Sequence, residues 1–246
     1  MKARAVATAT AEVGKGGAAA LPVLSLSSGA IEGLKWLAIA LMTLDHVNKY
    51  VFHATLPFAF ELGRIAMPLF AFVMAYNLSR PDTLARGSYQ RSMRRLAAFG
   101  VLTTPISVSL GGLLWGFWPF NILFMLLTAA AVMYLVEKGG QANKSMAALV
   151  FIVGGSLVEF WWPAVGFTVA CWFYCKRPGW VSLFFAAFCC FALTPINTNF
   201  WAMAVFPVIF AAAKINFGLP RSKWYVFYAY YPLHLALILM LQYAIN

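Results

Sequence analysis

The amino-acid sequence predicts an all-α, polytopic integral membrane protein with about nine transmembrane helices, and three observations support this. Hydrophobic residues make up 63% of the 246 positions and charged residues only 10%, a composition far from that of a soluble domain. The apolar residues gather in runs that are too long and too continuous for the alternating strands of a membrane barrel. Most Lys and Arg residues of the chain, whose net charge is +11, fall between these runs, where they set topology rather than bind nucleic acid; Lys49 and Arg64 are the exceptions.

Residues 1–30 are expected to form a flexible cytoplasmic tail that precedes a single helical domain over residues 31–246. The tail is rich in Ala, Gly, Ser and Thr and carries Lys2 and Arg4 near its start. A secretory signal peptide is the alternative, but the apolar part of the tail is short and is interrupted by Pro22. These features favour a flexible tail over a signal peptide.

Nine apolar runs follow the tail, and each is interpreted as one membrane-spanning helix. A span needs about 20 residues and tolerates about 17, a length that several of the runs do not reach. The shortest pair meets around residues 161–163. The runs cover residues 34–54, 58–79, 94–113, 116–136, 146–160, 162–175, 180–195, 198–214 and 224–244.

The basic residues indicate the orientation of these helices, because cytoplasmic loops of membrane proteins carry an excess of Lys and Arg. With the amino terminus in the cytoplasm, the five arginines of residues 80–95 lie inside. The basic residues of the later loops on that side are Lys138, Lys144, Lys176, Arg177, Lys214, Arg221 and Lys223. The opposite loops, residues 111–119, 159–163 and 195–200, contain no Lys or Arg. Nine crossings then place the carboxyl terminus in the periplasm.

The second half of the first apolar run is unusually polar for a helix in lipid. It contains Asp45, His46, Asn48, Lys49 and His53, although a charge at the centre of an inserted helix costs roughly 3 kcal/mol. On a helix, Asp45 meets Asn48 and Lys49 at i+3 and i+4. Two interpretations stay open from these residues alone: a general base built from Asp45 and His46, or a salt bridge that packs the bundle.

The second apolar run begins with another polar group, Glu61 and Arg64, and ends at Asn77. Gly63 and Pro68 flank Arg64 and favour a break in the helix, which would aim the guanidinium into a cavity. From there Arg64 can stabilise an oxyanion, hold the carboxylate of the first helix or bind a phosphate. Glu61 is expected to join the same polar cluster, and Asn77 to cap or bond the backbone.

Three segments of the sequence resemble the TraX family. They are KWLAIALMTLDHVNK at residues 35–49, GRIAMPLFAF at residues 63–72 and YPLHL at residues 231–235. That family consists of polytopic bacterial membrane proteins of conjugation systems, and its namesake is associated with N-terminal acetylation of pilin. The chain is also distantly similar to transmembrane acyltransferases, which take acyl groups from acyl-CoA and share a polar first helix with an essential histidine.

The resemblance implies a membrane-embedded acetyltransferase of the bacterial inner membrane. The donor would be cytoplasmic acetyl-CoA as co-substrate, without a metal, and the acceptor the N-terminal amine of a conjugative pilin or prepilin subunit. The implied partners are this pilin and membrane lipids, and not nucleic acid. Two other classes stay open: a non-enzymatic assembly or chaperone factor for pilin, and a proton-coupled transporter, since Asp and His within a span also form proton relays.

The resemblance also implies roles for single residues. His46 would be the base, Asp45 would orient it or balance charge, Arg64 would stabilise developing negative charge, and His234 would contact the donor or steady His46. The expected supporting residues, for substrate or structure, are Lys49, Asn48, Glu61, Asn77 and Tyr231.

Acetyl-CoA carries several phosphates, so its binding is expected at a basic surface on the cytoplasmic side. Arg91, Arg94 and Arg95 of the arginine-rich loop, with Lys35 of the first helix, are the candidates for this contact. Topology and the attraction of anionic lipid headgroups explain the same arginines without a bound coenzyme.

Overall fold

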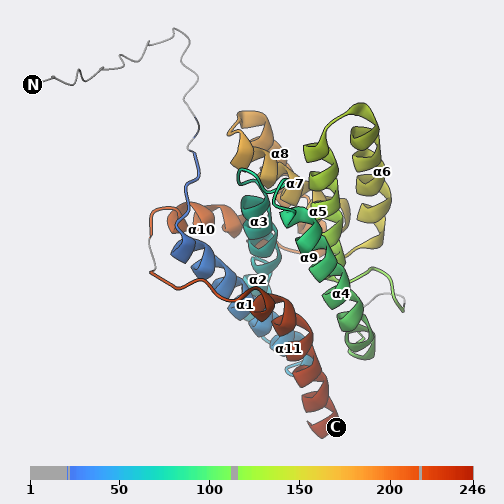
Figure 1. Cartoon of the computed structure of the whole chain (residues 1–246). Coiled ribbons are helices and arrows are strands. Elements are labelled where there is room, and N and C mark those ends of the chain that lie inside the picture. The colour runs from blue at the N-terminus through green and yellow to red at the C-terminus, as the bar shows by residue number, and fades with distance from the viewer. Residues whose placement is uncertain (1–20, 22, 112–115, 216–217, 246) are drawn as a thin grey trace, which may run out of the picture.

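The computed structural model describes residues 21, 23–111, 116–215 and 218–245, and within them every regular element is a helix (Figure 1). The all-α prediction is therefore confirmed for this part of the chain. Most of the expected tail, residues 1–20 and 22, lies outside the described residues.

The described residues form eleven α-helices and one 3₁₀ helix. Their bounds are α1 Ser28–Tyr50, α2 Pro57–Gly63, α3 Ala66–Leu78, α4 Ser88–Ser109, α5 Ile122–Lys138, α6 Gln141–Leu157, α7 Trp161–Lys176, α8 Trp180–Phe191, α9 Thr194–Asn197, η1 Trp201–Ala204, α10 Val205–Ala212 and α11 Trp224–Ile245. When the interrupted pairs α2/α3, α8/α9 and η1/α10 are each joined, these elements correspond to the nine predicted runs.

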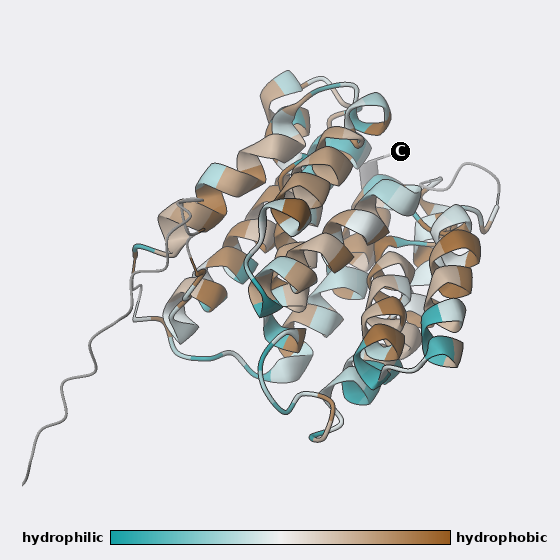
Figure 2. Ribbon diagram, turned by 90° about the horizontal axis from the view of Figure 1, so that it is seen from above, coloured by the Kyte–Doolittle hydropathy of each residue, from teal (hydrophilic) through white to brown (hydrophobic). Residues whose placement is uncertain are grey.

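By length and composition, three helical segments in the described residues could each cross a bilayer. They are Pro57–Leu78, which joins α2 and α3, Trp180–Asn197, and Trp224–Ala244. Large apolar side chains also point outward from α6 and α8, where Ile152, Val181 and Phe184 are each at least 60% exposed. Polar residues gather toward helix ends and loops (Figure 2). An apolar outer surface of this kind is typical of a protein that lies in lipid.

Helix α1 begins at Ser28, earlier than the predicted apolar run at residue 34, because Ser27 caps it. The Ser27 hydroxyl accepts a hydrogen bond from the backbone N–H of Ala30 at 3.0 Å, which satisfies one of the free N–H groups of the first turn. Ile31, Leu34 and other small or apolar residues at helical spacing bury one face of α1 in the core. The opposite end of α1 carries the polar residues.

Arg64 lies in the predicted break between two helices. Helix α2 ends at Gly63 and α3 begins at Ala66. Pro68 occupies the first turn of α3, where its missing N–H breaks no intrahelical hydrogen bond. The core of α3 is deeply buried, so the break lies between a central helix and a short helix that turns toward α1.

The last helix returns to the first, and both run in the same direction (Figure 1). Along α1, residues Lys35, Thr43, His46 and Tyr50 contact residues Phe227, Tyr230, His234 and Gln242 of α11 in the same order. Helix α4 also packs on α11 in this direction, since Arg95 and Phe99 contact Trp224 and Tyr228. Helices α1, α4 and α11 thus run in the same direction, and the contact brings the last helix to the polar part of α1.

Candidate functional site

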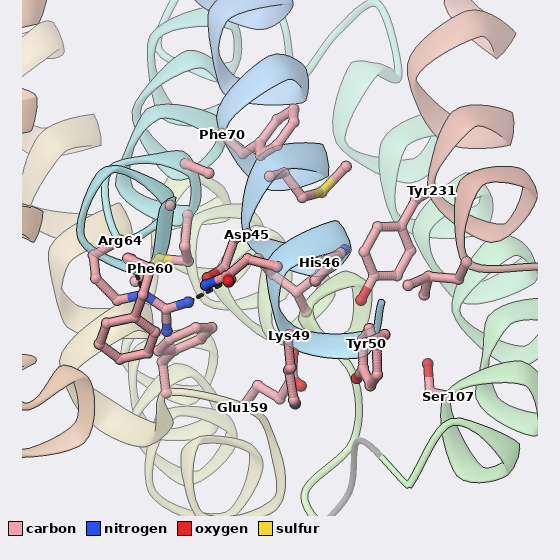
Figure 3. A pocket seen from close by; sticks show the side chains of 18 of the residues that line it. Asp45, His46, Lys49, Tyr50, Phe60, Arg64, Phe70, Ser107, Glu159 and Tyr231 are labelled. Carbon is pink, nitrogen blue, oxygen red and sulfur yellow. Dashed lines mark hydrogen bonds and ion pairs between the residues drawn. The ribbon is translucent and has the colours of Figure 1, made fainter. Parts of the chain in front are cut away.

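A cavity of about 350 Å³ lies beside the polar half of α1. Its wall comes from α1, from the break between α2 and α3, from the end of α4, the start of α5 and the middle of α11, and from the turn between α6 and α7 (Figure 3). The polar and aromatic residues that line it are Asp45, His46, Asn48, Lys49, Tyr50, Phe60, Arg64, Phe70, Ser107, Glu159, Phe160 and Tyr231. Segments more than 180 residues apart in the sequence thus share one cavity.

Asp45 and Arg64 form an ion pair in the cavity wall, with side chains 13% and 15% exposed. The guanidinium Nη2 donates to Asp45 Oδ2, Nε donates to the carbonyl of Phe60 at 3.2 Å, and the group stands 4.4 Å from the centre of the Phe60 ring. Asp45 Oδ1 is buried and accepts no hydrogen bond from any described residue. Arg64 therefore balances the charge of Asp45, one of the roles left open by the sequence.

Gly63 makes this ion pair possible. A Cβ atom added at Gly63 would lie 2.4 Å from the Cβ of Asp45, closer than side-chain atoms can approach. Only glycine therefore lets α2 come near enough to α1 for the next residue, Arg64, to reach the carboxylate.

His46 and His234 meet across the contact between α1 and α11. His46 Nδ1 lies 2.7 Å from His234 Nε2, and the two ring planes differ by 11°. The other nitrogen of His234, Nδ1, lies 2.9 Å from the backbone carbonyl of Tyr230. Both histidines therefore belong to a single hydrogen-bonded chain that ends at a carbonyl oxygen.

The carbonyl fixes where the protons lie along this chain. A carbonyl can only accept, so Nδ1 of His234 must carry a hydrogen, and Nε2 of a neutral His234 is an acceptor. Nε2 then accepts from Nδ1–H of His46, which leaves the lone pair of a neutral His46 on its Nε2. His46 is thereby held in the tautomer in which Nε2 can take a proton, as a general base requires.

The helices on both sides of this pair are tied together one turn away. Tyr230 and Thr43 share a hydrogen bond between their hydroxyls at 2.7 Å, and the Thr43 hydroxyl also bonds the carbonyl of Ile39 at 2.8 Å. Tyr231 lines the cavity and its ring centre lies 6.4 Å from that of His46. Of the two tyrosines before Pro232, one therefore fixes the helices and the other faces the site.

Asn48 has a structural role. Its amide accepts from the N–H of Leu56 at 2.9 Å and donates to the Leu56 carbonyl at 3.0 Å, and the residue is 1% exposed. It therefore fixes the loop that leads from α1 to α2. Lys49 is exposed at the cavity rim, with its amine 4.8 Å from the centre of the Tyr50 ring.

Two of the expected supporting residues lie outside the cavity wall. Glu61 is half-buried in α2 and is absent from the lining, and Asn77 is exposed near the far end of α3. The structure therefore does not place Glu61 in the cavity wall with Asp45 and Arg64. His53 lies exposed in the loop after α1.

The basic residues expected to bind coenzyme A lie at the other end of α1 and α4. Lys35 pairs with the buried Glu32 and stands 4.3 Å from the centre of the Phe227 ring, and Arg95 lies 3.9 Å from the centre of the Trp224 ring. Arg91 and Arg94 are exposed. At 1.5 Å per residue, Lys35 is about 16 Å along α1 from His46, so none of these residues reaches the cavity.

Glu159 is the cavity residue that the sequence reasoning missed. It lies in the turn between α6 and α7 and faces Lys49 and Arg64 across the cavity. The sequence offers one signal for it: Glu159 is the last acidic residue of the chain, between two strongly apolar runs.

The family model described as TraX protein matches residues 30–242. The chain belongs to the TraX family. Two curated relatives, both called Protein TraX, are similar to it. One, from Escherichia coli, is 33% identical over 131 residues, which cover 53% of this chain and 50% of the relative. The other, from Escherichia coli strain K12, is 32% identical over 135 residues, which cover 55% and 51%.

The chain thus spans about half the length of the curated TraX relatives it matches. No solved structure matches this TraX-family chain. The matched range includes the polar residues of α1, Arg64 in the break between α2 and α3, and His234 of α11.

Proposed function

We propose that this TraX-family chain is a membrane-embedded acetyltransferase, which moves an acetyl group from acetyl-CoA to the N-terminal amine of a pilin or prepilin subunit. The observation that carries the proposal is the hydrogen-bonded chain from the Tyr230 carbonyl through His234 to His46. It leaves a basic nitrogen at the wall of a cavity large enough for a reacting group.

In the proposed reaction the acceptor nitrogen attacks the thioester carbonyl of acetyl-CoA. His46 Nε2 takes a proton from the nitrogen as the C–N bond forms, and the C–S bond then breaks as the proton passes to the departing thiolate. Nε and Nη2 of Arg64 are engaged by Phe60 and Asp45, and the remaining N–H groups of the guanidinium donate to the oxyanion.

The donor and the acceptor approach from opposite ends of α1 in this proposal. The positive-inside rule places Lys35 and Arg95 in the cytoplasm, where they hold the phosphates of acetyl-CoA together with Arg91 and Arg94. The acyl-bearing arm then runs about 16 Å along α1 to reach His46. The acceptor, the amino terminus of the pilin subunit, enters from the rim beside Lys49 on the outer side of the inner membrane. There the chain contacts both pilin and lipid.

The experiment measures the intact mass of the candidate pilin from cells with and without this chain. A gain of about 42 Da at the amino terminus, the net mass added when one acetyl group replaces a hydrogen, is the expected result. His46→Ala should abolish the gain, because removing the base lowers such rates by about 10²–10⁴-fold. His53→Ala, which removes an exposed histidine of the following loop, is the matched control and should keep it.

The alternatives give different results in the same cells. A pilin that copurifies with the chain, yet has an unchanged mass, would refute the transferase and favour an assembly or chaperone factor. Proton movement across vesicles that contain the chain, without any acetylated product, would favour the transporter.

A further inference from the structure

Glu159 lies in the wall of the cavity and carries a carboxylate that has no role in the reaction proposed above. It belongs to the turn between α6 and α7, whereas His46 lies on α1, so the two groups face the cavity from different elements (Figure 3). Among the described residues no ion pair forms with Glu159: Arg64 pairs with Asp45, and the Lys49 amine, which faces Glu159 in the cavity, stands 4.8 Å from the centre of the Tyr50 ring. The cavity therefore holds one carboxylate without a paired cation.

The backbone fixes the position of Glu159. Its N–H donates to the carbonyl of Phe120 at 2.9 Å, and the N–H of Phe120 donates to the carbonyl of Leu157 at 2.7 Å. The next residue, Phe160, has a φ of +60°, in the left-handed region that non-glycine residues rarely adopt. Such conformations persist where the surroundings hold them, so this turn presents Glu159 at a defined place.

The surroundings of Glu159 combine charge with aromatic surface. Lys49, Tyr50 and His46 face it from α1, Arg64 from the break after α2, and Tyr231 from α11. Burial raises the pKa of Glu159 to about 7, although the positive charges of Lys49 and Arg64 and a backbone hydrogen bond from Ile122 oppose this rise. A carboxyl group in this state accepts and releases protons near neutral pH.

An amine acceptor needs a group of this kind. A terminal amine, with a pKa of about 7.7–8.0, is largely R–NH3⁺ at neutral pH and cannot attack a carbonyl until it loses a proton. A hydroxyl acceptor has no such requirement. A carboxylate near aromatic faces also suits an ammonium group, because both attract positive charge.

We propose that Glu159 binds the ammonium group of the acceptor and takes its first proton, which makes the site selective for primary amines over hydroxyls. This inference rests on the proposed acetyl transfer and names the residue that recognises its amine acceptor. The ammonium gives one proton to Glu159 before attack and a second to His46 as the C–N bond forms. The thiolate takes the proton of His46 when the C–S bond breaks, and Glu159 releases its proton to water at the rim, so one proton leaves per amide formed.

The test compares wild type with Glu159→Gln in membranes that contain equal amounts of each protein. The probes are labelled acetyl-CoA and an apolar peptide with a free amino terminus, and the initial rate is measured from pH 6 to pH 9. Glutamine keeps the size of the side chain and removes its charge. Asp82→Asn, which removes an exposed carboxylate from the loop before α4, is the control.

The wild-type rate should rise with pH as the Glu159 carboxyl loses its proton near pH 7. At pH 7 the Glu159→Gln variant should be at least tenfold slower, with a raised KM for the peptide and an unchanged KM for acetyl-CoA. At pH 9 its rate should approach that of wild type, because the peptide amine is then neutral without help. A residue with only a structural role would not show this recovery.

Three results would overturn the inference. A Glu159→Gln variant that equals wild type at every pH, or one that is equally slow at every pH, would remove Glu159 from proton transfer while acetyl transfer itself stands. Equal use of a peptide whose terminal amine is replaced by a hydroxyl would refute the amine selectivity. A wild-type chain that acetylates no peptide and no pilin would instead refute the proposed function, together with this extension of it.

Discussion

The relay between the two histidines predicts a graded loss of activity in His234→Ala. The substitution removes the atom that accepts from Nδ1–H of His46 at 2.7 Å, so His46 can change its tautomer and its ring orientation. One such hydrogen bond contributes about 0.5–1.5 kcal/mol net. At 1.4 kcal/mol for each factor of ten this corresponds to a loss of roughly 2- to 12-fold in rate, well short of the about 10²–10⁴-fold expected for removing the base itself in His46→Ala.

His234→Gln is the matched control for this prediction. The glutamine amide oxygen can accept the hydrogen bond from His46 Nδ1, which keeps Nε2 of His46 as the basic nitrogen. This variant should therefore retain more activity than His234→Ala, although it lacks a ring. The assay is the initial rate of acetyl transfer to an apolar peptide with a free amino terminus, in membranes that hold equal amounts of each variant.

A double-mutant cycle tests whether the two histidines act as a unit. His234 acts only through His46 in this mechanism, so the variant that lacks both should be no slower than His46→Ala alone. Losses that multiply would show that His234 contributes independently, and the relay would then be wrong.

Two other substitutions test the geometry around the site. Gly63→Ala should lower the free energy of unfolding by about 1–3 kcal/mol, because the new methyl group displaces the Asp45 side chain. Thermal denaturation in detergent measures this loss. An unchanged melting temperature would refute the close packing of α2 on α1. Replacing Arg91, Arg94 and Arg95 with Gln should raise the KM for acetyl-CoA more than it lowers kcat, as loss of a remote anchor does. Arg86→Gln is the control, and a change in membrane insertion alone would assign the loop to topology.

The parts of the site that depend on local sequence were predictable. The polar half of α1 and the break around Arg64 follow from single segments, since Gly63 and Pro68 interrupt a helix wherever they occur in this spacing. The ion pair between Asp45 and Arg64 was one of three roles left open, and it required only that two neighbouring helices pack together. Residues close in sequence leave few arrangements to choose from.

The remaining parts depend on contacts between distant segments. His234 lies 188 positions after His46, and no periodicity in either helix shows which face of α11 meets α1. Glu159 reaches the cavity through a turn that is held by the backbone of Phe120, an interaction without a side-chain signal. Glu61 precedes Arg64 by three positions, yet it does not line the cavity, because Arg64 follows the end of α2 at Gly63 and no longer continues the face of that helix.

The contacts between α1 and α11 also limit how the two substrates can meet. The helices are joined at three successive levels, by Thr43 with Tyr230, by His46 with His234, and by Gln242, whose amide donates to the Tyr50 carbonyl at 2.8 Å. These contacts join the carboxyl-terminal half of α1 to α11 on this side of the cavity, so under the proposed function the acceptor enters past the exposed rim. Under the proposed function, acetyl-CoA binds at the opposite end and only its acyl arm approaches His46. The acetyl group would then pass to an acceptor on the outer side while the coenzyme stays in the cytoplasm, and His46, near the end of α1 that faces the rim, is the base that both substrates approach.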